Sequence, residues 1–214
     1  MATTAFTNFL PEVMPQVPMC SDLVALNAVR NSAAEFCERT VFWQETQDAF
    51  TATSATFPYD LEAPSGARVS QVLAVLVNGV AIQPTTLDVL DTSVPNWRTT
   101  DADSPQLYYQ VNPYTMGVYP AIKTGSTAQV QLRVALAPSR TATGVEEFIY
   151  QLYAEVIAAG ALWRLMEMPA QPWSNPTTGA FYRSKFQQGV TDATIDANKT
   201  FGRSQLMVSP VRFA

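Results

Sequence analysis

The stretch that decides the fold runs from Thr143 to Val190, TGVEEFIYQLYAEVIAAGALWRLMEMPAQPWSNPTTGAFYRSKFQQGV. Apolar side chains recur in it at steps of three and four, which is typical of one helix face: Phe148, Ile149, Leu152, Tyr153, Val156, Ile157, Gly160 and Trp163. Pro169 ends this helix. Asn175-Pro176 begins a second, with Asn as the N-cap and Pro at the first helical position, where its missing N–H costs nothing. We therefore expect two long helices joined by a sharp corner.

The beginning of this unit and its small residues carry two further expectations. Thr143 and Glu146 have the spacing of a capping box, which places the start of the first helix at Thr143. The run Ala158–Ala161 consists of small residues and permits the close approach of another helix. The second helix is expected to continue to about Asn198.

A third helix is predicted near the N-terminus. Pro11, Pro15 and Pro18 favour an extended path over residues 1–20, and Ser21 is then placed to act as an N-cap. Apolar residues follow on one helical face up to about Thr40: Leu23, Leu26, Val29, Ala33, Phe36 and Cys37. This helix cannot bury its apolar face alone, so we expect it to pack against the two C-terminal helices.

Residues 41–142 have the pattern of a β module. Val69–Val77 leads into Asn78-Gly79, a strong signal for a two-residue hairpin turn, and Val80–Gln83 is the expected return strand. Gln129–Leu136 alternates between apolar and polar residues, as a half-buried strand does. The fold class is therefore α+β: a helical bundle of about three helices from residues 1–40 and 143–200, an inserted antiparallel β module at 41–142, and an extended C-terminal tail at 201–214.

Composition limits the functions that are open to the chain. Hydrophobic residues make up 47% and charged residues 14% of the 214 residues, and the net charge is -5. So few charges favour a subunit that neighbours cover, hence an oligomer, and the negative sign disfavours a broad grip on nucleic acid. The apolar runs are too short to cross a membrane, and the N-terminus lacks the pattern of a signal peptide, so we expect a protein made in a cytosol.

The residues that carry chemistry favour structural roles. The absence of histidine removes Ser-His-Asp and Cys-His arrangements and His-containing metal sites. Cys37 and Cys20 are interpreted as inert thiols, and the pairs Asp88/Asp91 and Asp101/Asp103 as turn-capping aspartates. Trp97 is the best candidate for an exposed aromatic contact, although local packing is the simpler interpretation. Tyr108, Tyr109, Tyr114 and Tyr119 surround one hairpin and are a possible interface. We expect no catalytic, cofactor or metal site.

Three segments resemble a known family: LPEVMPQVPMCSDLVALNAVRNSAAEFCERT from Leu10, APSGARVSQVLAVLVNG from Ala63, and the helical stretch that begins at LAPSRTATGVEEF from Leu136. Together they resemble the head-to-tail adaptor, or connector, proteins of short-tailed bacteriophages, similar in layout to the tail tubular protein A class. The resemblance implies a structural virion protein of the head–tail junction, made in the host bacterial cytoplasm. Such proteins form a ring, typically of twelve copies, that surrounds the channel for DNA ejection. They join the portal protein to the tail nozzle or tube.

The C-terminal tail is apolar for a chain end, and composition leaves open whether it packs on its own domain or docks in a groove of another protein. The resemblance implies the second, with portal-docking anchors at Leu206, Met207, Val211, Arg212 and Phe213. In a ring, the run Ala158–Ala161 has two possible roles, packing within the subunit or against the next one.

Two other function classes remain as alternatives. A carbohydrate- or receptor-binding tail module would use Trp97 and the tyrosine hairpin as its contact surface. A carboxylate-based tail hydrolase would use Asp or Glu pairs of the β module, such as Asp101 and Asp103.

Overall fold

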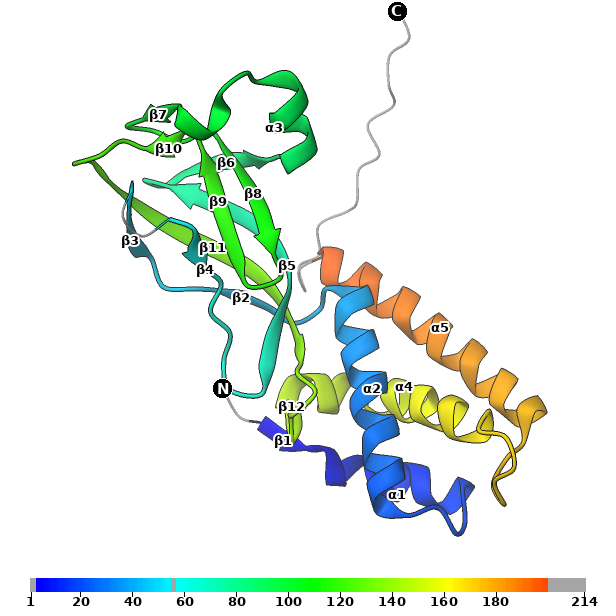
Figure 1. The fold of residues 1–214 in the computed structure, drawn as a ribbon. Helices are drawn as coiled ribbons and strands as arrows, with labels where there is room; N and C mark the ends of the chain where they lie inside the picture. Colours follow the sequence, from blue (N-terminus) through cyan, green and yellow to red (C-terminus); the bar gives the residue numbers. More distant parts are fainter. Residues whose placement is uncertain (1–2, 55–56, 200–214) are drawn as a thin grey trace, which may run out of the picture. The chain divides into compact units, whose positions relative to one another are not determined.

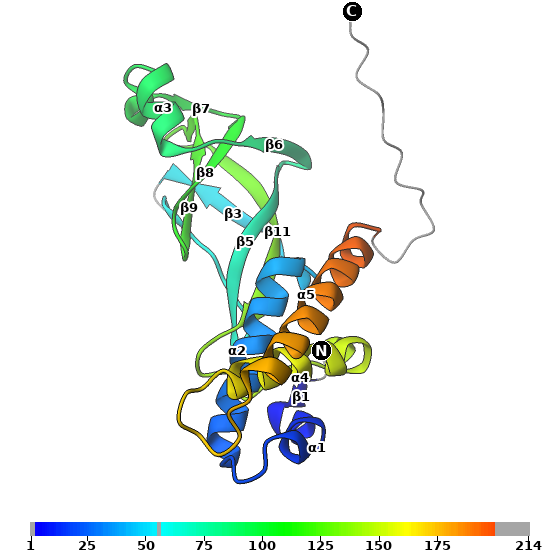
Figure 2. The same ribbon diagram turned by 90° about the vertical axis from the view of Figure 1, so that its right-hand side faces the viewer.

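The computed structural model describes residues 3–54 and 57–199 of the chain. These residues form two compact units (Figures 1 and 2). The helical unit lies within Met1–Phe42 and Thr143–Ala214, and the β unit is Trp43–Ala142. The chain therefore enters the helical unit, leaves it to build the β unit, and returns.

The helical unit is built on three long helices that contact one another: α2 (Asp22–Thr40), α4 (Glu147–Met166) and α5 (Pro176–Lys199). The short helix α1 (Leu10–Val13) also contacts α4 and α2. With α3 (Leu87–Ser93) of the β unit, the described part of the chain has five α-helices, so the expectation of about three helices is wrong in number. The class, α+β, is as predicted.

The N-terminal segment is not extended, as its prolines suggested, but is largely helical. After strand β1 (Thr3–Ala5) come a 3-10 helix at Phe6–Phe9, α1, and a second 3-10 helix at Met14–Gln16. Pro11 and Pro15 each lie in the first turn of their helix, where no N–H bond is lost. These helical turns bury Phe9 and Val13 completely, and this burial favours them over an extended path.

Helix α2 begins and ends where its sequence predicted, but it buries a different face at its start. Ser21 is the extended N-cap residue, although its side chain makes no capping bond, and Val41 ends the helix in the left-handed conformation with φ 53°. Leu23 is 70% exposed. The buried face begins two residues later at Ala25 and includes Ala28, Val29, Ser32, Ala33, Phe36 and Cys37.

Helix α4 begins at Glu147, four residues after the expected start. Strand β12 (Gly144–Glu146) precedes it and pairs antiparallel with β1, so the capping box does not form. The backbone N–H of Phe6 donates to the carbonyl oxygen of Thr143 at 3.0 Å. A Cβ at Gly144 would overlap the carbonyl of Thr4, so this pairing requires glycine. A contact with the distant N-terminus therefore overrides a local capping signal.

The corner between α4 and α5 matches the prediction. Helix α4 ends at Met166 and α5 begins at Pro176. The side-chain oxygen of Asn175 accepts a hydrogen bond from the N–H of Thr178 at 3.2 Å, which is the N-cap geometry expected before a proline at the first position.

The β unit contains one large sheet and a small parallel pair. The sheet order is β2-β11-β5-β6-β8-β9-β4, with β3 also paired to β11. The strands are β2 (Gln44–Thr46), β3 (Phe50–Thr53), β4 (Tyr59–Asp60), β5 (Ala67–Val77), β6 (Val80–Pro84), β7 (Asp101–Ala102), β8 (Leu107–Asn112), β9 (Thr115–Tyr119), β10 (Ala121–Ile122) and β11 (Thr127–Pro138). Strand β6 pairs parallel with β8, and β7 pairs parallel with β10, so the expectation of a wholly antiparallel module is wrong.

Both predicted hairpins are present. Val77 faces Val80 across the turn, and Asn78 and Gly79 have φ 51° and 80°, the positive values that a type I′ turn requires. The Asn78 side chain also accepts a hydrogen bond from the N–H of Gln129 at 2.9 Å, which ties the turn to β11. The second hairpin closes with Asn112 facing Thr115.

Candidate interaction surfaces

Trp97 is a core residue of the β unit and not an exposed contact. It begins a 3-10 helix at Trp97–Thr99, is 8% exposed, and packs in a cluster with Leu90 and Tyr109. Its indole N–H donates to the Asp91 carboxylate at 2.7 Å. Local packing, the simpler of the two interpretations, is therefore what the structure shows.

Asp91 is bound on both sides. Arg98 donates to it at 2.6 Å, and the Arg98 guanidinium lies 4.4 Å above the Trp97 ring. The hydrogen bonds from Arg98 and Trp97 hold the pKa of the Asp91 carboxyl below its ordinary value. The hydrogen bond from the indole N–H to Asp91 holds the Trp97 side chain in place.

The members of the pair Asp101/Asp103 and of the tyrosine hairpin also do not act together as one site. Asp103 accepts a hydrogen bond from the Ser126 hydroxyl at 2.7 Å. Tyr108 and Tyr109 are buried, and Tyr114 is 69% exposed. The hairpin therefore does not present four tyrosines as one surface. Within residues 3–54 and 57–199, no group of three Cys, Asp or Glu side chains is placed to hold a metal ion.

Cys37 is fully buried on α2, and burial raises the pKa of its thiol to about 12. Desolvation is also the largest cause of the raised pKa of Cys20. Since the thiolate is the nucleophilic form, a neutral thiol at physiological pH is unreactive. The burial predicted for Cys37 is confirmed, and its inertness stays a prediction.

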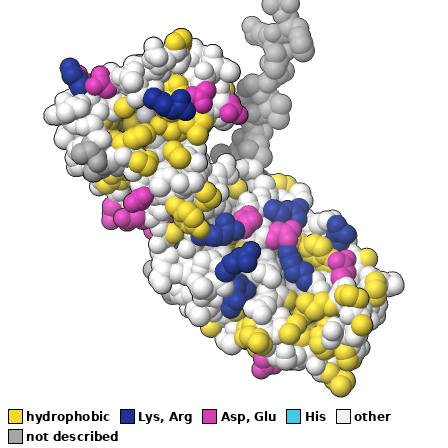
Figure 3. All heavy atoms as spheres, viewed as in Figure 1, with side chains coloured by type: hydrophobic (Ala, Val, Ile, Leu, Met, Phe, Trp, Pro, Cys, Tyr) yellow, Lys and Arg dark blue, Asp and Glu magenta, His cyan; other side chains and the backbone are white. Residues whose placement is uncertain are grey.

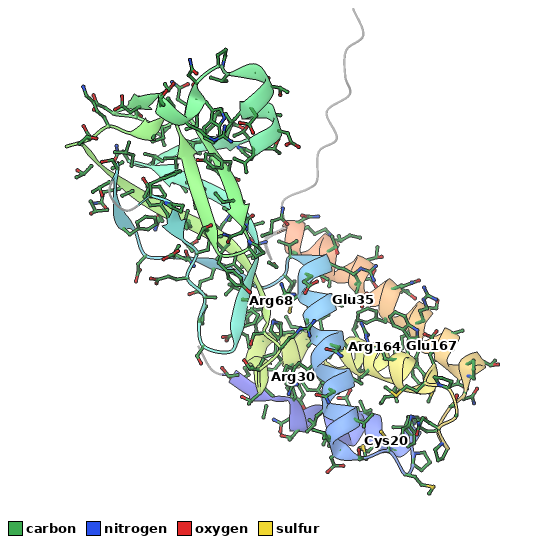
Figure 4. All side chains as sticks on the ribbon, viewed as in Figure 1. Cys20, Arg30, Glu35, Arg68, Arg164 and Glu167 are labelled. Carbon is green, nitrogen blue, oxygen red and sulfur yellow. The ribbon has the colours of Figure 1, made fainter. Side chains whose placement is uncertain are left out.

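The small residues Ala158–Ala161 pack inside the helical unit. Ser32 of α2 donates to the carbonyl of Ile157 at 2.7 Å, and a Cβ at Gly160 would lie 2.6 Å from the Phe186 ring of α5. Arg164, one turn further along α4, donates to Glu35 of α2 (Figure 4). Of the two possible roles, packing within the subunit is the one that the structure shows.

A polar groove of about 370 Å³ lies on the helical unit between the N-terminal segment and helices α4 and α5. Lys185 pairs there with Glu155 at 3.3 Å. Desolvation, followed by the nearby Glu155 carboxylate, raises the pKa of Glu12, and Lys185 opposes this shift. Two carboxylates, Glu12 and Glu155, line this groove with one positive charge, Lys185, so one negative charge is left without compensation within the lining.

The β unit carries a larger groove whose walls are apolar. This apolar groove has a volume of about 450 Å³. Its lining comes from β8, β9, β10, α3, the 3-10 helix that begins at Trp97, and residues between β3 and β4: Ser54, Phe57, Pro58, Leu87, Trp97, Arg98, Tyr109, Val111, Val118, Ala121 and Ile122. Figure 3 shows hydrophobic side chains gathered on the visible face of the β unit, with charged side chains of both signs beside them.

A second groove, the acidic groove, shares Pro58 with the first. It has a volume of about 590 Å³ and is lined by four carboxylates, Glu45, Asp48, Asp60 and Glu62, with Gln47, Ala49, Phe50, Thr51, Pro58, Tyr59, Ala63 and Pro64. None of these lining residues is basic. Pattern reasoning on the sequence missed this site because its carboxylates come from separate strands and turns.

The predicted anchors Leu206, Met207, Val211, Arg212 and Phe213 lie outside the described residues. Among the described residues, no helix is long and apolar enough to cross a membrane.

A family model, described as SU10 adaptor protein, matches residues 7–212. The chain therefore belongs to the SU10 adaptor protein family and is a phage structural adaptor. No curated protein matches it in sequence.

Proposed function

We propose that this protein is a ring-forming head-to-tail adaptor of a phage virion, which joins the portal protein to the tail nozzle or tube. The observation that carries the proposal is the family match, which spans both the helical and the β unit. The layout resembles the tail tubular protein A class, and a ring of twelve copies is the expected assembly. The protein acts by binding its partners and by the geometry of the ring that it forms.

Composition supports a subunit that lies between neighbours and beside DNA. Only 14% of the residues are charged, which suits a surface that other subunits cover. The net charge of -5 suits a channel that lets DNA pass without holding it. The protein is made in the host bacterial cytoplasm and acts at the head–tail junction.

The C-terminal tail is the proposed portal anchor. Leu206, Met207, Val211 and Phe213 supply apolar area, and Arg212 supplies a positive charge. Helix α5 continues to Lys199, so the tail follows directly from the helical unit. An apolar segment of this kind fits a groove of a partner protein.

Mass measurement tests the ring. The purified protein, alone and mixed with the portal of the same phage, is expected to form a closed oligomer of defined copy number. A protein that stays monomeric in both conditions contradicts the proposal. An electron-microscopy class average gives the symmetry independently.

Removal of residues 201–214 tests the tail. The shortened protein is expected to keep its melting temperature and lose portal affinity. Its control is the full chain with Leu23→Ser, a change at an apolar residue that is exposed on α2. Equal portal affinity of the shortened and full-length proteins would remove the assignment of the anchors.

The family match favours the adaptor over the two alternative functions. The carbohydrate- or receptor-binding module would use Trp97, which is buried against Leu90 and Tyr109, and the tyrosine hairpin, of which Tyr108 and Tyr109 are buried. The hydrolase would use Asp or Glu pairs of the β module such as Asp101 and Asp103, and Asp103 accepts a hydrogen bond from Ser126. We therefore propose neither.

A further inference from the structure

We propose that the two grooves of the β unit together receive the C-terminal tail of a second copy of this chain, with its apolar side chains in the apolar groove and an arginine in the acidic groove. This proposal rests on the proposed ring only in that a ring supplies a neighbouring copy. It adds a contact between copies of the adaptor in the absence of portal, which portal displaces when it takes up the same tail.

The apolar groove is suited to side chains and not to water. Its wall includes Val111, Val118, Ala121 and Ile122, and its volume of about 450 Å³ lies within the range of ~300–1,000 Å³ typical of binding pockets. Phe57 at 40% and Val111 at 45% exposure are large apolar side chains left partly in solvent. Their burial by a partner is favourable in proportion to the area removed from water.

The acidic groove adds a requirement for positive charge. Four carboxylates line it without a basic residue among them, and Pro58 belongs to both grooves. A segment that crosses Pro58 therefore meets apolar walls on one side and carboxylates on the other. The complementary ligand is an extended polypeptide that combines large apolar side chains with arginine or lysine.

The tail of this chain has that composition. Residues 200–214 read TFGRSQLMVSPVRFA, with arginines at 203 and 212, five large apolar residues after Gln205, and no Asp or Glu. All Asp and Glu residues of the chain lie elsewhere, and the side-chain charge of the tail is opposite in sign to the net charge of the whole molecule. Pro210 disfavours a helix and favours an extended path.

A contact between the tail of one copy and the grooves of another also has the symmetry that a ring requires. The donating surface and the receiving surface differ, so the interface is heterologous, and heterologous contacts generate closed rings when their rotation closes. Each copy both gives a tail and receives one.

Disulfide trapping between two full-length variants tests the proposal without portal. One variant carries Ala214→Cys, which leaves every apolar anchor in place, and the other carries Val111→Cys in the groove wall. The native Cys20 and Cys37 are buried. After mixing under mild oxidation, a cross-linked dimer is expected on a non-reducing gel.

The matched control for the receiver is Val80→Cys, which is 68% exposed on the β5–β6 hairpin and outside both grooves. Equal yields with Val111→Cys and Val80→Cys overturn the proposal, because the contact would then be random. A single chain with both Val111→Cys and Ala214→Cys that closes on itself, while mixed variants do not cross-link, overturns the second-copy assignment.

Charge reversal tests the acidic groove separately. Asp48→Lys with Asp60→Lys in the receiver is expected to lower the trapping yield about threefold, the scale of lost surface ion pairs. Asp88→Lys, an exposed change outside the groove, is the control. An unchanged yield with the double variant removes the acidic groove from the site.

Portal protein separates this proposal from the proposed function. One tail cannot fill two sites, so added portal is expected to lower the yield of the Ala214–Val111 cross-link. Trapping that succeeds but does not respond to portal leaves the groove assignment intact and contradicts portal docking by the tail. A ring without specific trapping leaves the adaptor function intact and overturns the groove assignment.

Discussion

The helical unit and the β unit close their cores by different means. In the helical unit the helices pack so closely that glycine backbone contacts side chains of the neighbouring helix. A Cβ at Gly160 would overlap Phe186, and a Cβ at Gly189 would overlap Val156. In the β unit, large side chains such as Trp97 fill the core, and two grooves of about 450 and 590 Å³ stay open at its surface. Added volume should therefore be costly in the first unit, whereas lost volume should be costly in the second.

The largest expected effect is the loss of the Trp97 ring. Trp97→Ala removes the packing against Leu90 and Tyr109 and the hydrogen bond to Asp91, so the free energy of unfolding should fall by about 3–5 kcal/mol. Urea denaturation measures the loss, and hydrogen exchange should localise it to the β unit. Trp97→Phe keeps most of the packing and should cost about 1–3 kcal/mol, because the hydrogen bond to Asp91 is lost while Arg98 still binds that carboxylate. Equal losses for the two variants would show that the hydrogen bond, and not the ring, holds this core.

The second effect concerns a single methyl group in the helical unit. Gly160→Ala should lower the free energy of unfolding by about 1–3 kcal/mol, because the new Cβ meets Ser32 and Phe186. Gly179→Ala on α5 is the matched control, since its Cβ finds Met166 at an ordinary 3.4 Å and helix propensity then favours alanine by about 1 kcal/mol. Thermal unfolding should give opposite signs for the two variants. A stabilising Gly160→Ala would contradict the close packing described above.

A third, smaller effect is expected at Gly79, where a substitution introduces backbone strain without steric crowding. A Cβ at Gly79 has nothing within 4 Å, but the residue has φ 80°. Gly79→Ala should therefore cost about 1–2 kcal/mol through conformation alone. Gly79→Asn should cost less, because asparagine tolerates positive φ. Denaturation midpoints of the two variants measure the difference, and equal midpoints would mean that the turn changes shape.

The smallest effect is expected where the β unit has free space. Ala121→Val adds two methyl groups at the wall of the apolar groove, and its effect on the free energy of unfolding should stay within about 0.5 kcal/mol. The same unfolding assay applies. A loss as large as that of Gly160→Ala would show that the groove is not open to added volume.

Local chemistry made a large part of the fold predictable. The turn at Asn78-Gly79 and the cap at Asn175-Pro176 formed where expected, because each depends on the φ preference or capping bond of two adjacent residues. The ends of α2 followed from its own periodicity in the same way.

Contacts between distant residues explain the failures. The capping signal at Thr143 gave way to the pairing of β12 with β1, about 140 positions away in sequence. The prolines before Ser21 were compatible with helical turns, and only the burial of Phe9 and Val13 selects those turns. The parallel pairing of β6 with β8 and the shared edge of the two grooves have no local signal at all.

The pairing of β1 with β12 also fixes the order in which parts of the chain can fold during synthesis. The β unit is one continuous segment, Trp43–Ala142, so all its strands are synthesised before Gly144–Glu146. The N-terminal residues Thr3–Ala5 must wait for that partner, an interval of about 7–30 s at bacterial elongation rates of ~5–20 residues per second. A newly made chain therefore has its β unit complete while Phe9 and Val13 still lack α4, and in that interval the N-terminal segment is the part of the chain most in need of protection from other nascent proteins.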